Sequence, residues 1–131
     1  MPVIETDMVI ALLNRNDARH SVAENLFTKI SEGPGIFLAG SALIEMELIY
    51  KSERIEKGLK RDIAHLIAIP NLKVLPVTHE IILLAIELRE RYSLSFFDSH
   101  HVATALMHDG KLIGTDQEYG IVSGLSLIAH S

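Results

Sequence analysis

The sequence predicts an α/β fold, in the form of a three-layer α/β/α sandwich around a central parallel sheet. Short apolar runs alternate along the chain with segments of helical periodicity, and this order of elements gives a parallel sheet with helices on both faces. The continuous apolar character of the runs is typical of strands that are buried on both faces. With 131 residues and 48% hydrophobic content, the chain is expected to form one domain, residues 1–131, around one core.

The strands and helices are predicted from these two patterns. The apolar runs predict five strands, at residues 2–6, 36–39, 72–76, 111–115 and 125–129. The segments between them predict six helices, at residues 8–14, 17–32, 41–52, 56–69, 78–92 and 98–110.

Capping and breaking residues mark the helix boundaries in the first half of the chain. Asp17 is the predicted N-cap of the second helix, which Gly33-Pro34-Gly35 ends. Ser41 is the predicted N-cap of the third helix, and Pro70-Asn71 stops the fourth.

Similar signals delimit the two helices of the second half. Thr78 is predicted to cap a strongly periodic helix that carries Ile81, Ala85 and Leu88 at successive turns. The last helix is predicted to begin near Asp98. It is expected to end at Gly110, because glycine readily adopts the left-handed conformation that closes many helices.

Composition excludes several classes of protein. The absence of cysteine excludes disulfides, thiolate zinc sites and cysteine nucleophiles. The longest apolar run, residues 81–86, is too short to cross a bilayer, and no secretory signal is evident, so we expect a cytoplasmic protein with no membrane partner. The net charge of −5 argues against a passive nucleic-acid-binding protein. It does not argue against an enzyme that meets phosphates through bound metal.

Acidic residues follow the apolar runs, and this placement is the most informative feature of the chain. The five candidates are Glu5, Asp7, Glu45, Asp98 and Asp116. In parallel α/β folds the carboxyl ends of the strands form the ligand crevice, where gathered carboxylates would repel one another without a counter-charge. Mg²⁺ and Mn²⁺ prefer oxygen ligands, and two such ions about 4 Å apart can activate water for attack on a phosphodiester. The pattern therefore favours a divalent-metal site with catalytic carboxylates.

Each acid also has an ordinary structural explanation. Asp7 and Asp98 could cap the helices that follow them, Asp116 could belong to a turn, and Glu45 could be solvated. Glu5 is harder to explain in this way, because a carboxylate in a strand buried on both faces needs a partner. Side chains alternate along a strand, so Glu5 and Asp7 are expected to point the same way.

Four segments resemble, in order, the acidic motifs of PIN-domain nucleases. Ile4-Glu5-Thr6-Asp7-Met8-Val9-Ile10-Ala11-Leu12-Leu13 resembles the opening Asp-Thr-Asn-Val-Leu-Ile signature of that family. The segments that resemble the other three motifs are Ser41–Leu48, Phe97–Ala105 and Gly114–Asp116. The resemblance covers nearly the whole chain. It implies the strand order 3-2-1-4-5, a site where the first and fourth strands meet, and divalent-metal-dependent cleavage of RNA.

The resemblance also implies which residues act and with what partners. Glu5, Asp7, Glu45, Asp98 and Asp116 would hold Mg²⁺ or Mn²⁺. Glu5 stands where the family has its first catalytic Asp, so either Glu5 or Asp7 is the ligand from the first strand. The small size most resembles the VapC-type toxins, which implies an RNA substrate, a homodimer, and a small antitoxin that occupies the acidic site, often through a basic side chain.

Two other functions remain open. One is a catalytically inert PIN-like module that binds RNA or protein, with the metal geometry spoiled by Glu5. The other is a different acidic-site metallohydrolase that acts on DNA or a small phosphate ester. His101, three residues after Asp98, is a candidate for supporting an acid, and Tyr50, Tyr92 and Tyr119 are too scattered to form a stacking platform.

Overall fold

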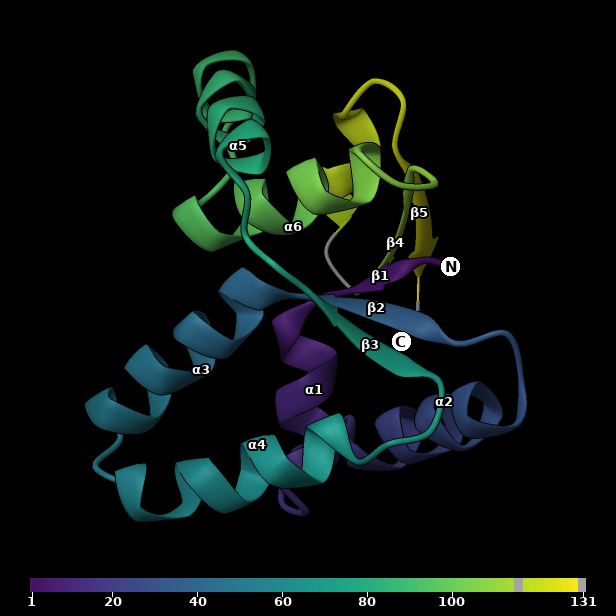
Figure 1. Cartoon of the computed structure of the whole chain (residues 1–131), viewed down its shortest axis with the longest axis vertical. Helices are drawn as coiled ribbons and strands as arrows, with labels where there is room; N and C mark the ends of the chain where they lie inside the picture. The colour runs from purple at the N-terminus through teal and green to yellow at the C-terminus, as the bar shows by residue number, and fades with distance from the viewer. Residues whose placement is uncertain (115–116, 130–131) are drawn as a thin grey trace.

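The five strands form one parallel sheet in the order β3-β2-β1-β4-β5, as the family resemblance implied (Figure 1). The structure is a computed structural model that describes residues 1–114 and 117–129. The strands are β1 (Val3–Ile4), β2 (Ile36–Ala39), β3 (Leu72–Leu75), β4 (Lys111–Gly114) and β5 (Ser126–Ala129). The shortest strand, β1, therefore lies at the centre and pairs with β2 and β4.

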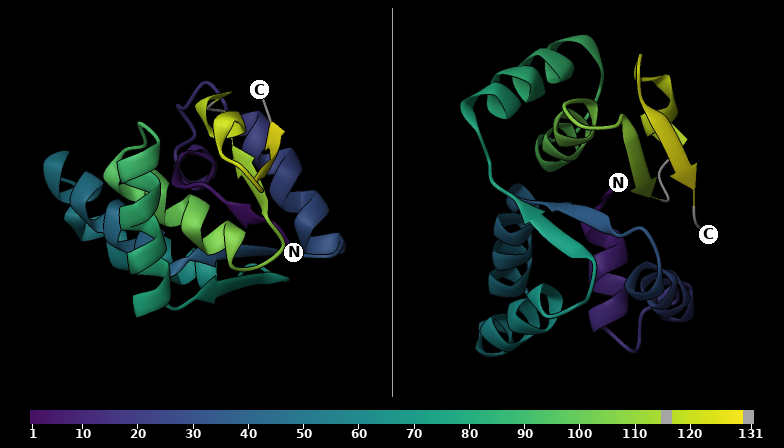
Figure 2. Two further views of the ribbon diagram at one scale, coloured as in Figure 1. Left: turned by 90° about the horizontal axis from the view of Figure 1, so that it is seen from above. Right: turned by 45° about the vertical axis from the view of Figure 1, so that its right-hand side comes forward.

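Helices cover both faces of this sheet and confirm the predicted α/β/α sandwich (Figure 2). The α-helices are α1 (Thr6–Leu13), α2 (His20–Glu32), α3 (Gly40–Ser52), α4 (Leu59–Ile67), α5 (His79–Arg91) and α6 (Phe96–Leu106). Two short 3₁₀ helices are η1 (Glu56–Gly58) and η2 (Gln117–Ile121). The first four helices lie on one side of the sheet, and α5, α6 and η2 lie on the other (Figures 1 and 2). No helix in the described ranges is long and apolar enough to span a bilayer.

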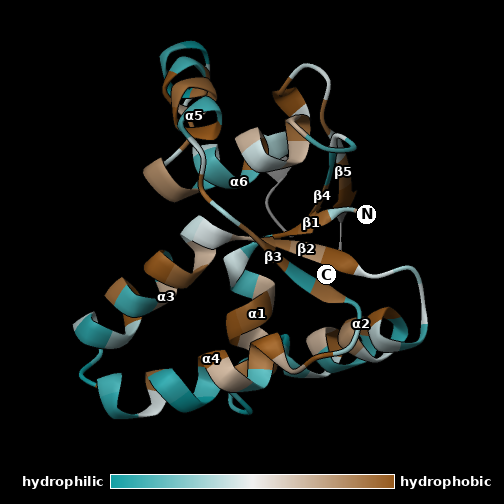
Figure 3. Cartoon of the chain, in the orientation of Figure 1, coloured by the Kyte–Doolittle hydropathy of each residue, from teal (hydrophilic) through white to brown (hydrophobic). Residues whose placement is uncertain are grey.

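The central strand contributes to a hydrophobic core on each side. Val3 and Ile4 are both fully buried, and because strand side chains alternate they point to opposite faces. Ile4 packs in the cluster beneath α1 to α4, whereas Val3 packs in the cluster beneath α5 and α6. Figure 3 shows the corresponding hydrophobic colour of the central strands. This burial on both faces is what the continuous apolar runs predicted.

Several predicted boundaries are confirmed at the level of individual atoms. The Thr78 hydroxyl accepts a hydrogen bond from the backbone N–H of Ile81 at 3.3 Å, so Thr78 is the N-cap of α5. The helix α6 ends at Leu106, four residues before the predicted end, and Gly110 closes the turn that follows: its φ is +74°, and its N–H donates to the Ala105 carbonyl at 2.8 Å. The helix α2 ends at Glu32, directly before the predicted breaker.

Two predicted N-caps are wrong. The helix α2 begins three residues after Asp17, whose carboxylate instead accepts the backbone N–H of Arg19 at 2.8 Å in the preceding turn. The helix α3 begins at Gly40, because β2 passes into it without an intervening turn, and this places Ser41 inside the first helical turn. Ser95 caps α6 and accepts the Asp98 N–H at 3.3 Å, so the Asp98 carboxylate is not needed as a cap.

Candidate active site

The acidic candidates gather where the central strands end. β1 and β2 lead directly into α1 and α3, and α6 contacts α3 although the two helices cover opposite faces of the sheet (Figure 1). Glu5 and Asp7 lie at the start of α1, Glu45 lies in α3, and Asp98 lies in the first turn of α6. The fifth candidate, Asp116, lies outside the described residues.

Glu5 is buried directly after the central strand. The residue is only 3% exposed, and its backbone N–H donates a hydrogen bond to the Ile113 carbonyl of β4 at 3.0 Å. Its carboxylate lies against the Cα of Gly114, at the end of β4. Glu5 is therefore held at the junction of the first and fourth strands, where the family resemblance places the site.

Asp7 does not point the same way as Glu5, and that prediction is wrong. The strand ends at Ile4, and the chain becomes helical from Thr6 onward, so the alternation of strand side chains does not extend to Asp7. Asp7 occupies the first turn of α1 and is exposed, whereas Glu5 is buried. The two acids thus face the site at different depths.

The charge of Asp7 is coupled to those of two other candidates. Removal of water by the surrounding protein raises the pKa of its carboxyl above the ordinary 3.8, and the guanidinium of Arg19 opposes this rise in pKa. The carboxylates of Glu45 and Asp98 raise the pKa of Asp7 further. Acids from α1, α3 and α6 therefore lie close enough to repel one another.

Glu45 is engaged by a buried histidine. Its side chain is 20% exposed, and its Oε1 lies 3.0 Å from the Nε2 of His101 in α6. The same ring nitrogen lies 3.0 Å from the hydroxyl of Thr6. Glu45 is thus part of a polar contact between helices rather than an ordinary solvated residue. His101 supports the acid from α3, whereas the sequence pointed to Asp98, its neighbour in α6.

Tyr119 is a site residue that the sequence did not reveal. It lies in η2, is 1% exposed, and its hydroxyl is hydrogen-bonded to the carboxylates of Asp98 and Glu5. Burial raises the pKa of this phenol, and the two hydrogen bonds and the nearby negative charges raise it further. The only signal in the sequence was its position three residues after Asp116.

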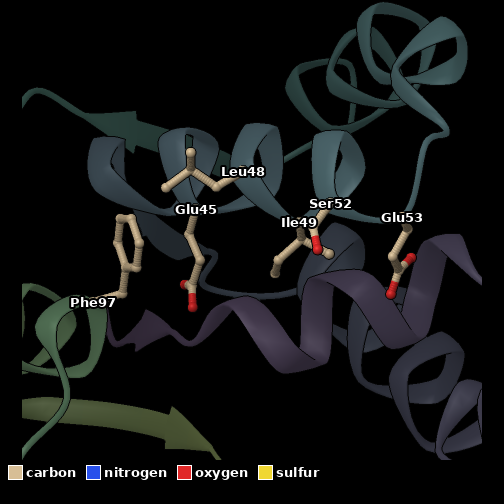
Figure 4. A pocket seen from close by; sticks show the side chains of 6 residues that line it. All are labelled: Glu45, Leu48, Ile49, Ser52, Glu53 and Phe97. Carbon is tan, nitrogen blue, oxygen red and sulfur yellow. The ribbon is translucent and has the colours of Figure 1, made fainter.

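An open pocket of about 340 Å³ adjoins Glu45. It runs along α3, with the ring of Phe97 at one end and Glu53 at the other (Figure 4). Leu48 and Ile49 give it apolar walls, and Glu45 points from α3 toward α1. An aromatic ring beside carboxylates provides a surface on which an unpaired nucleic-acid base can stack.

The donor chemistry of the site suits a hard cation, although the side chains are not yet arranged as a coordination sphere. Within residues 1–114 and 117–129, no three acidic or histidine side chains are grouped closely enough to hold a metal ion. The candidates nevertheless present carboxylate oxygens from separate elements, and the carboxylates of Glu45 and Asp98 add to the effect of burial in raising the pKa of Asp7. Carboxylates in this relationship are the ligands that Mg²⁺ and Mn²⁺ prefer.

The comparisons with known proteins agree with this architecture. The family model described as the PIN domain matches residues 3–123. The fold resembles VapC20 of Mycobacterium tuberculosis, a toxin that cleaves the sarcin-ricin loop, with a TM-score of 0.76 and 21% identity over 92% of this chain and 93% of that one. It also resembles VapBC2 of Rickettsia felis, solved bound to a DNA fragment from its promoter, with a TM-score of 0.79 and 11% identity over 98% of each chain.

A further similar structure is a toxin–antitoxin complex from Klebsiella pneumoniae, with a TM-score of 0.68 and 16% identity over 96% of each chain. At these identities the three structures establish a shared fold. No curated protein sequence matches the chain.

Proposed function

The chain belongs to the PIN-domain family, and from this premise we propose that it is a divalent-metal-dependent endoribonuclease and the toxin of a toxin–antitoxin pair. The observation that carries the proposal is the convergence of the acids: Glu45 meets the same His101 nitrogen as Thr6, the residue between Glu5 and Asp7, and the charges of Glu45 and Asp98 act on Asp7. Three helices bring these acids together at the end of the central strands, and a cation would relieve the repulsion between them. A purely structural role would give no reason to assemble them.

The proposed ligands of Mg²⁺ or Mn²⁺ are carboxylates, namely Glu5, Asp7, Glu45, Asp98 and Asp116. When bound, such a cation supplies positive charge that stabilises the attacked phosphodiester and makes water easier to deprotonate. Among the described candidates, Glu45 is held in place by His101, and Asp98 and Glu5 are held by Tyr119. The exposed Asp7 is the acid best placed to meet an incoming substrate.

The proposed partners follow from the site and from the similar structures. Phe97 and the pocket beside Glu45 suit a single-stranded stretch of RNA, whose bases can stack on an aromatic ring. The same acidic site would accept a basic side chain from a small antitoxin, because the positively charged guanidinium of an arginine can take the place of a metal ion between carboxylates. We propose that the protein acts in the cytoplasm as a homodimer, as the toxin resemblance implies.

Cleavage assays with purified protein test this proposal. Single-stranded RNA should be cleaved when Mg²⁺ or Mn²⁺ is present, and EDTA should stop the reaction. Asp98→Asn and Glu45→Gln should each abolish cleavage without unfolding the protein. Glu47→Gln is the matched control, because Glu47 is exposed two residues beyond Glu45 on the same helix and should retain full activity.

Other outcomes would identify the alternatives. RNA binding without cleavage at any metal concentration would support an inert PIN-like module. Faster hydrolysis of DNA or of a chromogenic phosphodiester than of RNA would support a different metallohydrolase. Activity that persists in Asp98→Asn would place the chemistry elsewhere and overturn the proposed site.

A further inference from the structure

The most unusual feature of the site is an imidazole that touches two of its motifs with one atom. His101 is 1% exposed in α6 and is followed in sequence by the core residues Val102 and Ala103. Its Nε2 lies 3.0 Å from the Oε1 of Glu45 and 3.0 Å from the Oγ1 of Thr6. The histidine therefore connects the start of α1 to the middle of α3.

The chemistry of these neighbours fixes where the ring proton lies. An ionised carboxylate can only accept hydrogen bonds, so the contact with Glu45 requires the proton on Nε2. The Thr6 hydroxyl can accept from the same N–H in a shared hydrogen bond. The other ring nitrogen, Nδ1, is buried and has no hydrogen-bond partner among the described residues. Nδ1 therefore carries the lone pair and no proton, since a buried N–H without an acceptor would cost more free energy than a buried lone pair without a donor.

A histidine is a poor choice for this position on packing grounds alone. A fully buried polar group with one unpaired nitrogen costs free energy that an aliphatic side chain of similar volume would avoid. The compensating contact is the hydrogen bond to Glu45, whose carboxylate remains 20% exposed beside the pocket. The ring thus fixes the direction of an acid that would otherwise be a flexible, solvated glutamate.

We propose that His101 is a positioning residue. Its Nε2–H, which also contacts the Thr6 hydroxyl, holds the Glu45 carboxylate in the orientation needed for metal binding. This inference rests on the proposed function and deepens it. Side chains that orient metal ligands in this way typically change metal affinity or activity by about 10–100-fold when they are replaced. His101 does not contact the substrate, because it is buried beneath Glu45 and Thr6.

Metal affinity measured without RNA provides the first test. Mn²⁺ binding is followed by electron paramagnetic resonance for the wild type, His101→Leu and His101→Gln. The leucine variant should bind Mn²⁺ about 10–100-fold more weakly. The glutamine variant should stay within a few-fold of the wild type, because its amide can still donate to Glu45. Equal Mn²⁺ affinity of the leucine variant and the wild type would overturn the proposal.

A spectroscopic measurement on the wild-type protein provides a second test, which does not depend on whether the His101 variants fold. Long-range ¹H–¹⁵N spectra should show His101 with its proton on Nε2, and Glu45→Gln or added Mg²⁺ should shift that nitrogen signal. A proton on Nδ1, or a signal that neither change affects, would contradict the inference. If the wild type binds metal but cleaves no RNA, the nuclease proposal fails while the role of His101 in metal binding stands.

Discussion

The carboxylate of Glu5 lies directly against the backbone of Gly114 at the end of β4. A Cβ atom on residue 114 would come within 2.7 Å of the Glu5 Cδ and within 2.9 and 3.0 Å of its two oxygens. No side chain fits between them, so the buried position of Glu5 depends on a glycine at 114. The family motif has a shorter Asp at this point, and here the longer Glu5 reaches across the neighbouring strand toward Tyr119.

Replacing this glycine should displace the acid. Gly114→Ala is expected to force the Glu5 carboxylate out of its site, to lower the free energy of unfolding by about 1–3 kcal/mol, and to reduce cleavage. Urea unfolding and the RNA assay measure these effects. Gly120→Ala is the matched control, because nothing lies within 4 Å of the Cβ it would introduce.

A second substitution shows whether the clash with Glu5 is the cause. Glu5→Asp in the Gly114→Ala background withdraws the carboxylate by one methylene and should recover part of the lost stability, so the two changes should not be additive. If Gly114→Ala is as stable and active as Gly120→Ala, the contact between Glu5 and Gly114 has no importance for the site.

Asp7 should reveal that the site is assembled at the expense of stability. Its pKa is raised in the folded protein above the ordinary 3.8, first by dehydration and then by Glu45 and Asp98. The folded state therefore binds this proton more tightly than the unfolded state. The free energy of unfolding consequently falls as the pH rises from 3.8 through the range in which the Asp7 carboxyl of the folded protein ionises. Asp7→Asn should raise the melting temperature by a few degrees at neutral pH in EDTA.

The gain from Asp7→Asn should disappear below pH 3.8, where the carboxyl is protonated in both states of the wild type. Differential scanning calorimetry across this pH range measures it, with the exposed Glu47→Gln as the control. A lower melting temperature of Asp7→Asn at neutral pH would show that Asp7 stabilises the metal-free fold.

The alternation of apolar runs with helical segments was sufficient to predict the three α/β/α layers. Strands that are buried on both faces of a parallel sheet form continuous hydrophobic runs, and these are recognisable in the sequence. Thr78 and Gly110 were predictable for a similar reason, since a cap and a left-handed turn depend on residues within one turn of helix. The end of β1 was not predictable, because the hydrogen bond from Glu5 to Ile113 that closes it joins residues far apart in sequence.

The same limit applied to the supporting residues of the site. His101 meets Thr6 across 95 residues and Glu45 across 56, so no local pattern could reveal either contact. Tyr119, in η2, likewise reaches Asp98 in the first turn of α6 and Glu5 directly after β1, so its contacts also join remote parts of the chain. The motif resemblance pointed to the acids themselves, whereas the groups that hold them in place required the tertiary structure.

Asn71 should be the polar residue that fixes the entrance to β3. It adopts a left-handed conformation with φ of +66°, and its Nδ2 lies 3.2, 3.1 and 3.2 Å from the carbonyl oxygens of Ile30, Ser31 and Gly33. Its amide thus caps the end of α2, where carbonyl groups lack helical partners. Asn71→Ala should lower the free energy of unfolding by about 1–2 kcal/mol in urea denaturation.

Two further variants at position 71 separate the backbone from the side chain. Asn71→Gly removes the hydrogen bonds but tolerates the positive φ, so it should be more stable than Asn71→Ala. Asn71→Asp supplies oxygens where a donor is needed and should be less stable than Asn71→Gly. If all three variants unfold at the urea concentration of the wild type, the amide contributes nothing to stability.

The hydroxyl of Tyr119 should make the fold sensitive to alkali. Its pKa is raised above the ordinary 10.0, chiefly by burial and then by its hydrogen bonds to Asp98 and Glu5. The folded state therefore keeps this proton at a pH where the unfolded chain loses it. The stability that Tyr119 contributes is fully present below pH 10 and is lost as the pH rises above it.

Unfolding in urea between pH 8 and pH 11 measures this effect. The free energy of unfolding of the wild type should fall more steeply above pH 10 than that of Tyr119→Phe, because lysines and arginines titrate equally in both proteins. Tyr50→Phe should also flatten the curve, since burial and a hydrogen bond to Asp62 raise the pKa of Tyr50 as well. Parallel curves for the wild type and Tyr119→Phe would mean that the phenol ionises as readily in the folded protein as in the unfolded chain, and that it does not hold Glu5 and Asp98 together.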